Sequence, residues 1–138
     1  ETVAQTFEVI AKMGLPVLAI PGNHDHGGPG GPWEQDFVLR QIKDMAPNFR
    51  ILLDAEPVEM DTAIILPCPL LTKHTATDPT EWVRDGQPAW EGLGDKPRVV
   101  LAHGSVHDFA SKDADEESME HRPPNMVDLE FFMDSMIS

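Results

Sequence analysis

Two short apolar runs, each followed at once by histidine, constrain the fold of this chain more than any other feature. Residues 16–20 (Pro-Val-Leu-Ala-Ile) lead into the hexapeptide Pro-Gly-Asn-His-Asp-His at 21–26, and residues 98–102 (Arg-Val-Val-Leu-Ala) lead into His103 and Gly104. Short apolar runs bounded by glycine or proline are typical of buried strands that end in loops. We therefore expect two histidine-bearing loops at the carboxyl ends of strands, where open α/β sheets bind ligands.

Helical patterns surround the first of these runs. Val3, Phe7 and Ile10 are spaced as one apolar stripe, which predicts a helix over residues 2–13 that ends at Gly14. A second helix is expected from about residue 34 to 45, with an apolar face made by Phe37, Val38, Ile42 and Met45. Further short apolar runs predict strands at 49–53, 58–60 and 63–66, the last two as a hairpin.

This order of elements predicts an α/β fold, a layered sheet with flanking helices, as one domain over residues 1–138. The acidic stretch within residues 105–125 is expected to be a mobile loop, and residues 126–137 a terminal helix. If the two histidine-bearing strands are parallel neighbours, His24 and His103 converge although 79 positions (103 − 24) separate them.

The charge balance argues against a stand-alone nucleic-acid binder. Asp and Glu number 24 against 10 Lys and Arg, for a formal net charge of −14, whereas nucleic-acid binding requires a basic surface. A nuclease is still compatible with this charge, because bound divalent ions reverse the local field and attract phosphate.

Cysteine content and hydropathy exclude several further classes of protein. Cys68 is the only cysteine, which excludes an internal disulfide and a cysteine-rich zinc site, and its apolar neighbours predict a small buried side chain. No apolar run approaches the roughly 20 residues of a membrane span, so no membrane partner is expected. Without a visible signal sequence, we expect a cytoplasmic location, although the chain begins at Glu1 and leaves an upstream segment open.

The hexapeptide carries donor groups suited to metal-assisted chemistry. In an extended backbone Asn23 and Asp25 point to one side and His24 and His26 to the other, so the four cannot all face one ion. Amide and carboxylate oxygens suit hard divalent ions, and imidazole suits zinc, iron or manganese. Imidazole titrates near neutral pH, so His24 is a candidate proton donor to a leaving group.

The sequence Gly22-Asn23-His24-Asp25 resembles the Gly-Asn-His-(Asp/Glu) signature of the calcineurin-like metallophosphoesterases, and most closely that of their DNA-repair exonuclease subgroup. The apolar strand ending in His103 is similar to the next block of that family. The resemblance implies that Asn23 and His103 are metal ligands, that His24 is the general acid, and that Asp25 orients its neighbours. His26 is expected to be a loop or substrate-side residue rather than a ligand. It also implies two divalent ions, with manganese favoured over iron, zinc or magnesium, and a phosphoester substrate for which DNA is a candidate.

The chain departs from the family pattern at both ends. The family's Asp-x-His and Gly-Asp-x-x-Asp blocks do not occur before Gly22, and its closing Gly-His-x-His block is missing after His121. The resemblance therefore covers the middle of the pattern, and we expect an internal fragment that binds metal weakly and catalyses poorly alone. The alternative is a degenerate regulatory or binding domain of the same fold that has lost its metals.

Two other interpretations of the hexapeptide need to be considered. Gly-Asn-His-Asp can be an ordinary turn, because asparagine and aspartate favour turns after glycine, but the His103 block also fits the family. Asp25-His26 followed by glycines also suggests a metallo-β-lactamase type of site. That site needs histidines at the positions of Asn23 and Pro21, so we reject it. The other histidines, His74, His107 and His121, are expected at the surface.

Overall fold

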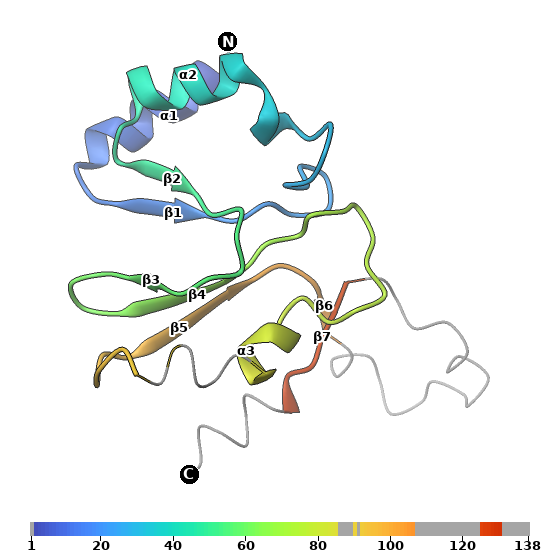
Figure 1. The fold of residues 1–138 in the computed structure, drawn as a ribbon. Helices are drawn as coiled ribbons and strands as arrows, with labels where there is room; N and C mark the ends of the chain where they lie inside the picture. The colour runs from blue at the N-terminus through green and yellow to red at the C-terminus, as the bar shows by residue number, and fades with distance from the viewer. Residues whose placement is uncertain (1, 86–89, 91, 107–124, 131–138) are drawn as a thin grey trace.

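The computed structural model describes residues 2–85, 90, 92–106 and 125–130, and shows a mixed α/β architecture (Figure 1). The elements of the first half are α1 (Thr2–Met13), β1 (Val17–Ala19), the 3₁₀ turn η1 (Pro32–Glu34), α2 (Asp36–Met45) and β2 (Phe49–Ile51). Those of the second half are β3 (Val58–Glu59), β4 (Ile64–Cys68), α3 (Glu81–Asp85), β5 (Arg98–Ala102), β6 (Ser105–Val106) and β7 (Met126–Val127).

The strands form three small sheets. β1 pairs with β2 in parallel, β4 pairs with β3 in antiparallel and with β5 in parallel, and β6 pairs with β7 in parallel. In Figure 1, α1 and α2 lie on one side of the β1–β2 sheet, and the β3–β4–β5 sheet lies on its other side. The predicted hairpin is confirmed, because Met60 N–H donates to the Ala63 carbonyl at 2.8 Å and closes the turn between β3 and β4.

Helix α1 has the predicted bounds and ends as expected, with Gly14 in the left-handed region at φ 65°. Phe7 is buried and packs its ring at 5.7 Å from that of Phe49 on β2, so the helix is fixed to the sheet by an aromatic pair. The predicted stripe is wrong at Val3, which is 53% exposed. One end of the helix therefore extends beyond the sheet that the stripe covers.

Helix α2 begins two residues later than predicted, because the chain first makes the 3₁₀ turn η1. Val38 on its predicted apolar face is buried, but Phe37 is 64% exposed and does not belong to that face. A residue 100° around a helix from its neighbour faces another direction, so Val38 packs inward and Phe37 points outward.

The densest core lies around β4 rather than around β1. Ile64, Leu66, Cys68 and Val83 form a buried cluster, against which Trp82, Trp90, Leu93 and Val100 pack. The predicted burial of Cys68 is confirmed, and its thiol donates to the Leu66 carbonyl at 3.7 Å. Burial raises the pKa of the Cys68 thiol to about 11, opposed in part by the nearby Trp82 indole.

The C-terminal predictions need correction. Met126 and Val127, predicted to begin a helix, form β7 instead, and Ser105 and Val106, predicted as loop, form its partner β6. The β-branched valines of the two strands favour strand formation. Their pairing cannot be recognised from the sequence, because a long segment separates them. The predicted mobile loop over 107–124 and the rest of the terminal helix over 131–137 lie outside the described residues.

None of the helices in the described part of the chain has the length and apolar character of a membrane span.

Candidate metal centre

The side chains of Asn23 and His103 meet directly. His103 Nε2 lies 3.1 Å from Asn23 Oδ1, although the two residues are 80 positions apart. Nε2 donates this hydrogen bond in the tautomer that carries the proton on Nε2, because the Asn23 oxygen can only accept. His103 is exposed and Asn23 half-buried, so the pair is open to solvent on one side.

Asn23 and His103 meet although the strands before them are not the parallel neighbours that were expected to bring His24 and His103 together. β1 and β5 are not neighbours and belong to different sheets. β4 connects them instead: its Cys68 pairs with Ala102, the residue before His103. Two residues beyond β4, Leu70 donates its N–H to the Pro21 carbonyl at 3.2 Å.

Leu70 also accepts a hydrogen bond from the other end of the hexapeptide loop. Gly27 N–H donates to the Leu70 carbonyl at 2.7 Å, so the main chain of one residue binds the loop before Asn23 and after His26. Because β4 also fixes the start of the His103 loop, the extension of β4 sets the distance between the two loops.

Asp25 closes the turn that carries Asn23 and His24. Its carboxylate accepts the N–H of Gly22, three residues earlier, at 2.9 Å, and so links the two ends of the turn. Its backbone carbonyl accepts a second hydrogen bond from Trp33 Nε1 at 2.6 Å. The Asp25 carboxylate thus faces the backbone of the turn, as a group that orients its neighbours would.

Gly22 allows the two loops to approach. A Cβ at this position would lie 3.2 Å from both Cε1 and Nδ1 of His103 and 3.3 Å from Asp25 Oδ1. Such contacts are tighter than normal packing, so a side chain here would displace the imidazole from Asn23. The glycine of the signature is therefore explained by close packing, and its φ is not in the left-handed region.

The histidines of the hexapeptide differ in environment. His24 is exposed and makes no hydrogen bond or ion pair with any other described residue, so its imidazole is accessible to a ligand from solvent. His26 is half-buried, and its Nδ1 is enclosed without a partner among the described residues. Buried polar atoms normally have partners, so this nitrogen is an exception among the described residues.

Imidazole, thiolate and carboxylate side chains do not gather in threes in the part of the chain that the structure describes. No group of three or more His, Cys, Asp or Glu side chains in that part is arranged to hold a metal ion. His74 is exposed, as predicted, on the loop after β4. His107 and His121 lie outside the described residues.

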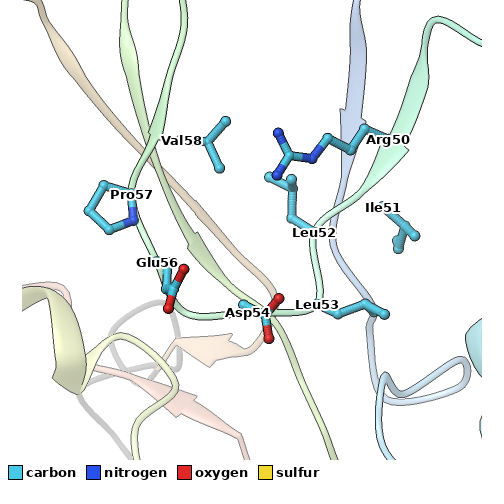
Figure 2. Close-up of a pocket in the computed structure, with 8 residues that line it drawn as sticks. All are labelled: Arg50, Ile51, Leu52, Leu53, Asp54, Glu56, Pro57 and Val58. Carbon is cyan, nitrogen blue, oxygen red and sulfur yellow. The ribbon is translucent and has the colours of Figure 1, made fainter.

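A separate cavity lies between β2 and β3 (Figure 2). It has a volume of about 180 Å³ and is lined by residues 50–54 and 56–58, with Arg50 and Val58 facing each other across it. It contains none of the predicted site residues and is smaller than most small-molecule pockets. The candidate site is therefore the open surface at the Asn23–His103 pair and not this cavity.

Sequence reasoning missed Trp33 and Leu70 at this site. Leu70 acts through its main chain alone, so no side-chain pattern could have identified it. Trp33 follows the glycine-rich loop, and its position eight residues after Asp25 shows no recognisable spacing. The missing signal in both cases is a hydrogen bond to main chain, for which many residue types serve equally well.

Comparisons of the chain with protein-family models, with curated proteins and with solved structures gave no match.

Proposed function

We propose that this chain is a divalent-metal phosphoesterase domain of the calcineurin-like type, in which Asn23 and His103 bind one metal ion. The observation that carries the proposal is the 3.1 Å separation of Asn23 Oδ1 and His103 Nε2. Ligand atoms bound about 2.0–2.2 Å from one ion and at right angles to each other lie about 3 Å apart. An amide oxygen and an imidazole nitrogen at this separation fit two ligand positions of one ion.

The other residues supply the proton chemistry. A divalent ion at the pair would neutralise charge on phosphoryl oxygens and activate water at neutral pH. His24, exposed beside the pair and unpartnered among the described residues, is proposed to donate a proton to the leaving oxygen. Asp25 is proposed to hold His24 and Asn23 in place through the turn hydrogen bond to Gly22. His26 remains assigned to the substrate side.

Two neutral ligands make a weak site, because neither side chain brings the negative charge that holds hard cations. We therefore propose low metal affinity and low turnover for this chain alone, with two ions, manganese foremost, in the complete site of the family. The substrate is proposed to be a phosphoester, with DNA as a candidate. Given the net charge of −14, metal binding would be needed to attract phosphate.

A non-catalytic binding or regulatory domain of the same fold is the second candidate. The observation in its favour is that Asn23 and His103 satisfy each other by a hydrogen bond, so the pair is stable without an ion.

Manganese titration followed by NMR tests the proposal. Mn²⁺ bound at the pair will broaden the ring signals of His24 and His103, because paramagnetic relaxation falls steeply with distance. Asn23→Ala and His103→Ala should abolish this selective broadening at His24, and His74→Ala should preserve it. Broadening of His24 that persists unchanged in both Asn23→Ala and His103→Ala would contradict a metal site at the pair.

Hydrolysis of bis(p-nitrophenyl) phosphate in Mn²⁺ then separates the two candidate functions. The phosphoesterase proposal expects slow turnover that is lost in His24→Ala while the selective broadening is retained. Selective Mn²⁺ binding without turnover would favour the non-catalytic domain.

A further inference from the structure

The main chain of the turn that carries Asn23 and His24 accepts a hydrogen bond from a side chain outside the turn. Trp33 Nε1 donates to the Asp25 carbonyl at 2.6 Å. Among the described residues, no other side chain from outside residues 21–26 hydrogen-bonds to the main chain of this turn. We propose that Trp33 is a positioning residue for the turn and acts through Asp25 without touching metal or substrate.

Asp25 links Trp33 to the turn, because both its backbone carbonyl and its side-chain carboxylate accept hydrogen bonds. The carbonyl accepts from Trp33, and the carboxylate accepts from Gly22 N–H at 2.9 Å. Asn23 and His24 lie between Gly22 and Asp25, so their backbone directions depend on both hydrogen bonds. Without the indole, Asp25 would keep only the hydrogen bond within the turn, so the turn between its two main-chain hydrogen bonds to Leu70 would be less restrained relative to His103.

Close packing of the glycine-rich loop before Trp33 fixes the position of the indole. Trp33 lies in η1, directly after the glycine-rich loop, and its ring is half-buried. A Cβ on Gly31 would overlap the His26 carbonyl, and a Cβ on Gly28 would overlap the Leu71 carbonyl. The loop therefore packs main chain against main chain at both glycines. This packing brings Trp33 back over the turn and restricts the positions that its indole can adopt.

Amide hydrogen exchange of Trp33→Phe tests the inference without metal. The substitution keeps an aromatic ring and removes the N–H donor. We expect exchange of the Gly22 amide to accelerate by about tenfold, while that of Ile64, which donates to Pro97 in the core, changes by less than about twofold.

Trp90→Phe is the matched control. Trp90 Nε1 donates to the Val83 carbonyl at 3.0 Å, so this variant loses the same type of hydrogen bond at the β4 core. We expect it to change exchange of the Gly22 amide by less than about twofold. Equal acceleration of Gly22 exchange in Trp33→Phe and Trp90→Phe would show that Trp33 contributes only general stability and would overturn the inference.

A second readout rests on the proposed function and separates the two claims. If the chain binds Mn²⁺ at Asn23 and His103, Trp33→Phe should weaken that binding by about tenfold, as loss of outer groups around metal sites commonly does, and Trp90→Phe should not. Unchanged Mn²⁺ affinity in Trp33→Phe would overturn the positioning role. Absence of Mn²⁺ binding in the wild type would reject the proposed function, and hydrogen exchange would still decide the role of Trp33.

Discussion

The side chains of Asn23 and His103 lie 3.1 Å apart although the strands that precede them belong to different sheets. The link is the end of β4, which pairs with β5 and binds both ends of the hexapeptide loop through Leu70. The site is thus built on the junction of two sheets, and its geometry depends on how closely the glycine-rich loop can approach that junction.

Gly28→Ala should be much more destabilising than Gly30→Ala. A Cβ at Gly28 would overlap the Leu71 carbonyl, a main-chain atom that cannot turn aside, so we expect a loss of about 3 kcal/mol. Gly30 has open space around it but sits at φ 78°, so alanine there should cost about 1 kcal/mol. Urea unfolding followed by tryptophan fluorescence measures both values, and equal losses would contradict the close approach at Leu71.

Asp78 should make the stability of the fold depend on pH in the acidic range. Burial by itself would raise the pKa of Asp78. Hydrogen bonds from the Thr80 hydroxyl and amide, the Asp128 amide and Arg84 outweigh this, so the pKa lies below its ordinary value of 3.8. A lowered folded-state pKa stabilises the fold above the unfolded value, and this contribution is lost as pH falls through the folded pKa.

Asp78→Asn tests this dependence. The variant should be less stable than wild type by about 1–3 kcal/mol at pH 7, since it loses hydrogen bonds to a charged acceptor. The difference should narrow as the pH falls below 3.8, where the unfolded wild-type chain binds a proton at Asp78 before the folded protein does. Urea midpoints measured from pH 7 to pH 3 provide the comparison, and a constant difference across this range would refute the assignment.

The Cys68 thiol should be unreactive in the native state. It is fully buried, and burial raises its pKa to about 11, which leaves about one thiolate in a thousand at pH 8. Labelling with a disulfide reagent should therefore proceed only as fast as the protein opens, and it should accelerate sharply across the urea transition. Rapid labelling in buffer would show that β4 is not the buried centre of its sheet.

Leu66→Ala should measure how much the core around β4 contributes to the free energy of unfolding. Leu66 is 1% exposed, and removal of such a side chain typically costs about 2–5 kcal/mol. Leu15→Ala is the control, because Leu15 is 63% exposed and its substitution should change the unfolding free energy by less than about 0.5 kcal/mol. Similar losses for both would mean that the core lies elsewhere.

Elements defined by local pattern were predicted well. α1 and β5 have the predicted bounds, and the β3–β4 hairpin forms where the polar pair at 61–62 interrupts two apolar runs. Such patterns are read within one element, where side-chain period and breakers are sufficient. Errors appear where a residue's environment depends on another element: Val3 and Phe37 remain exposed, because no element among the described residues covers them.

The topology of the candidate site was predicted wrongly. His24 and His103 were expected to converge on parallel neighbouring strands, whereas the structure brings His103 to Asn23 from strands of different sheets. Metal binding and catalysis by these residues remain predictions. The supports of the turn, Trp33 and Leu70, were not predicted, because both act on carbonyl or amide groups that every residue carries.

The sequence by itself determined where strands end in polar loops and which side chains those loops present, because periodicity, glycine and proline act over a few neighbouring positions. Only the tertiary structure decided that Asn23 and His103 meet and that β4 joins them. It also decided that the glycines of the loop are needed for main-chain approach. These features depend on distances between segments far apart in the chain, which are set by sheet pairing and close packing and leave no local pattern.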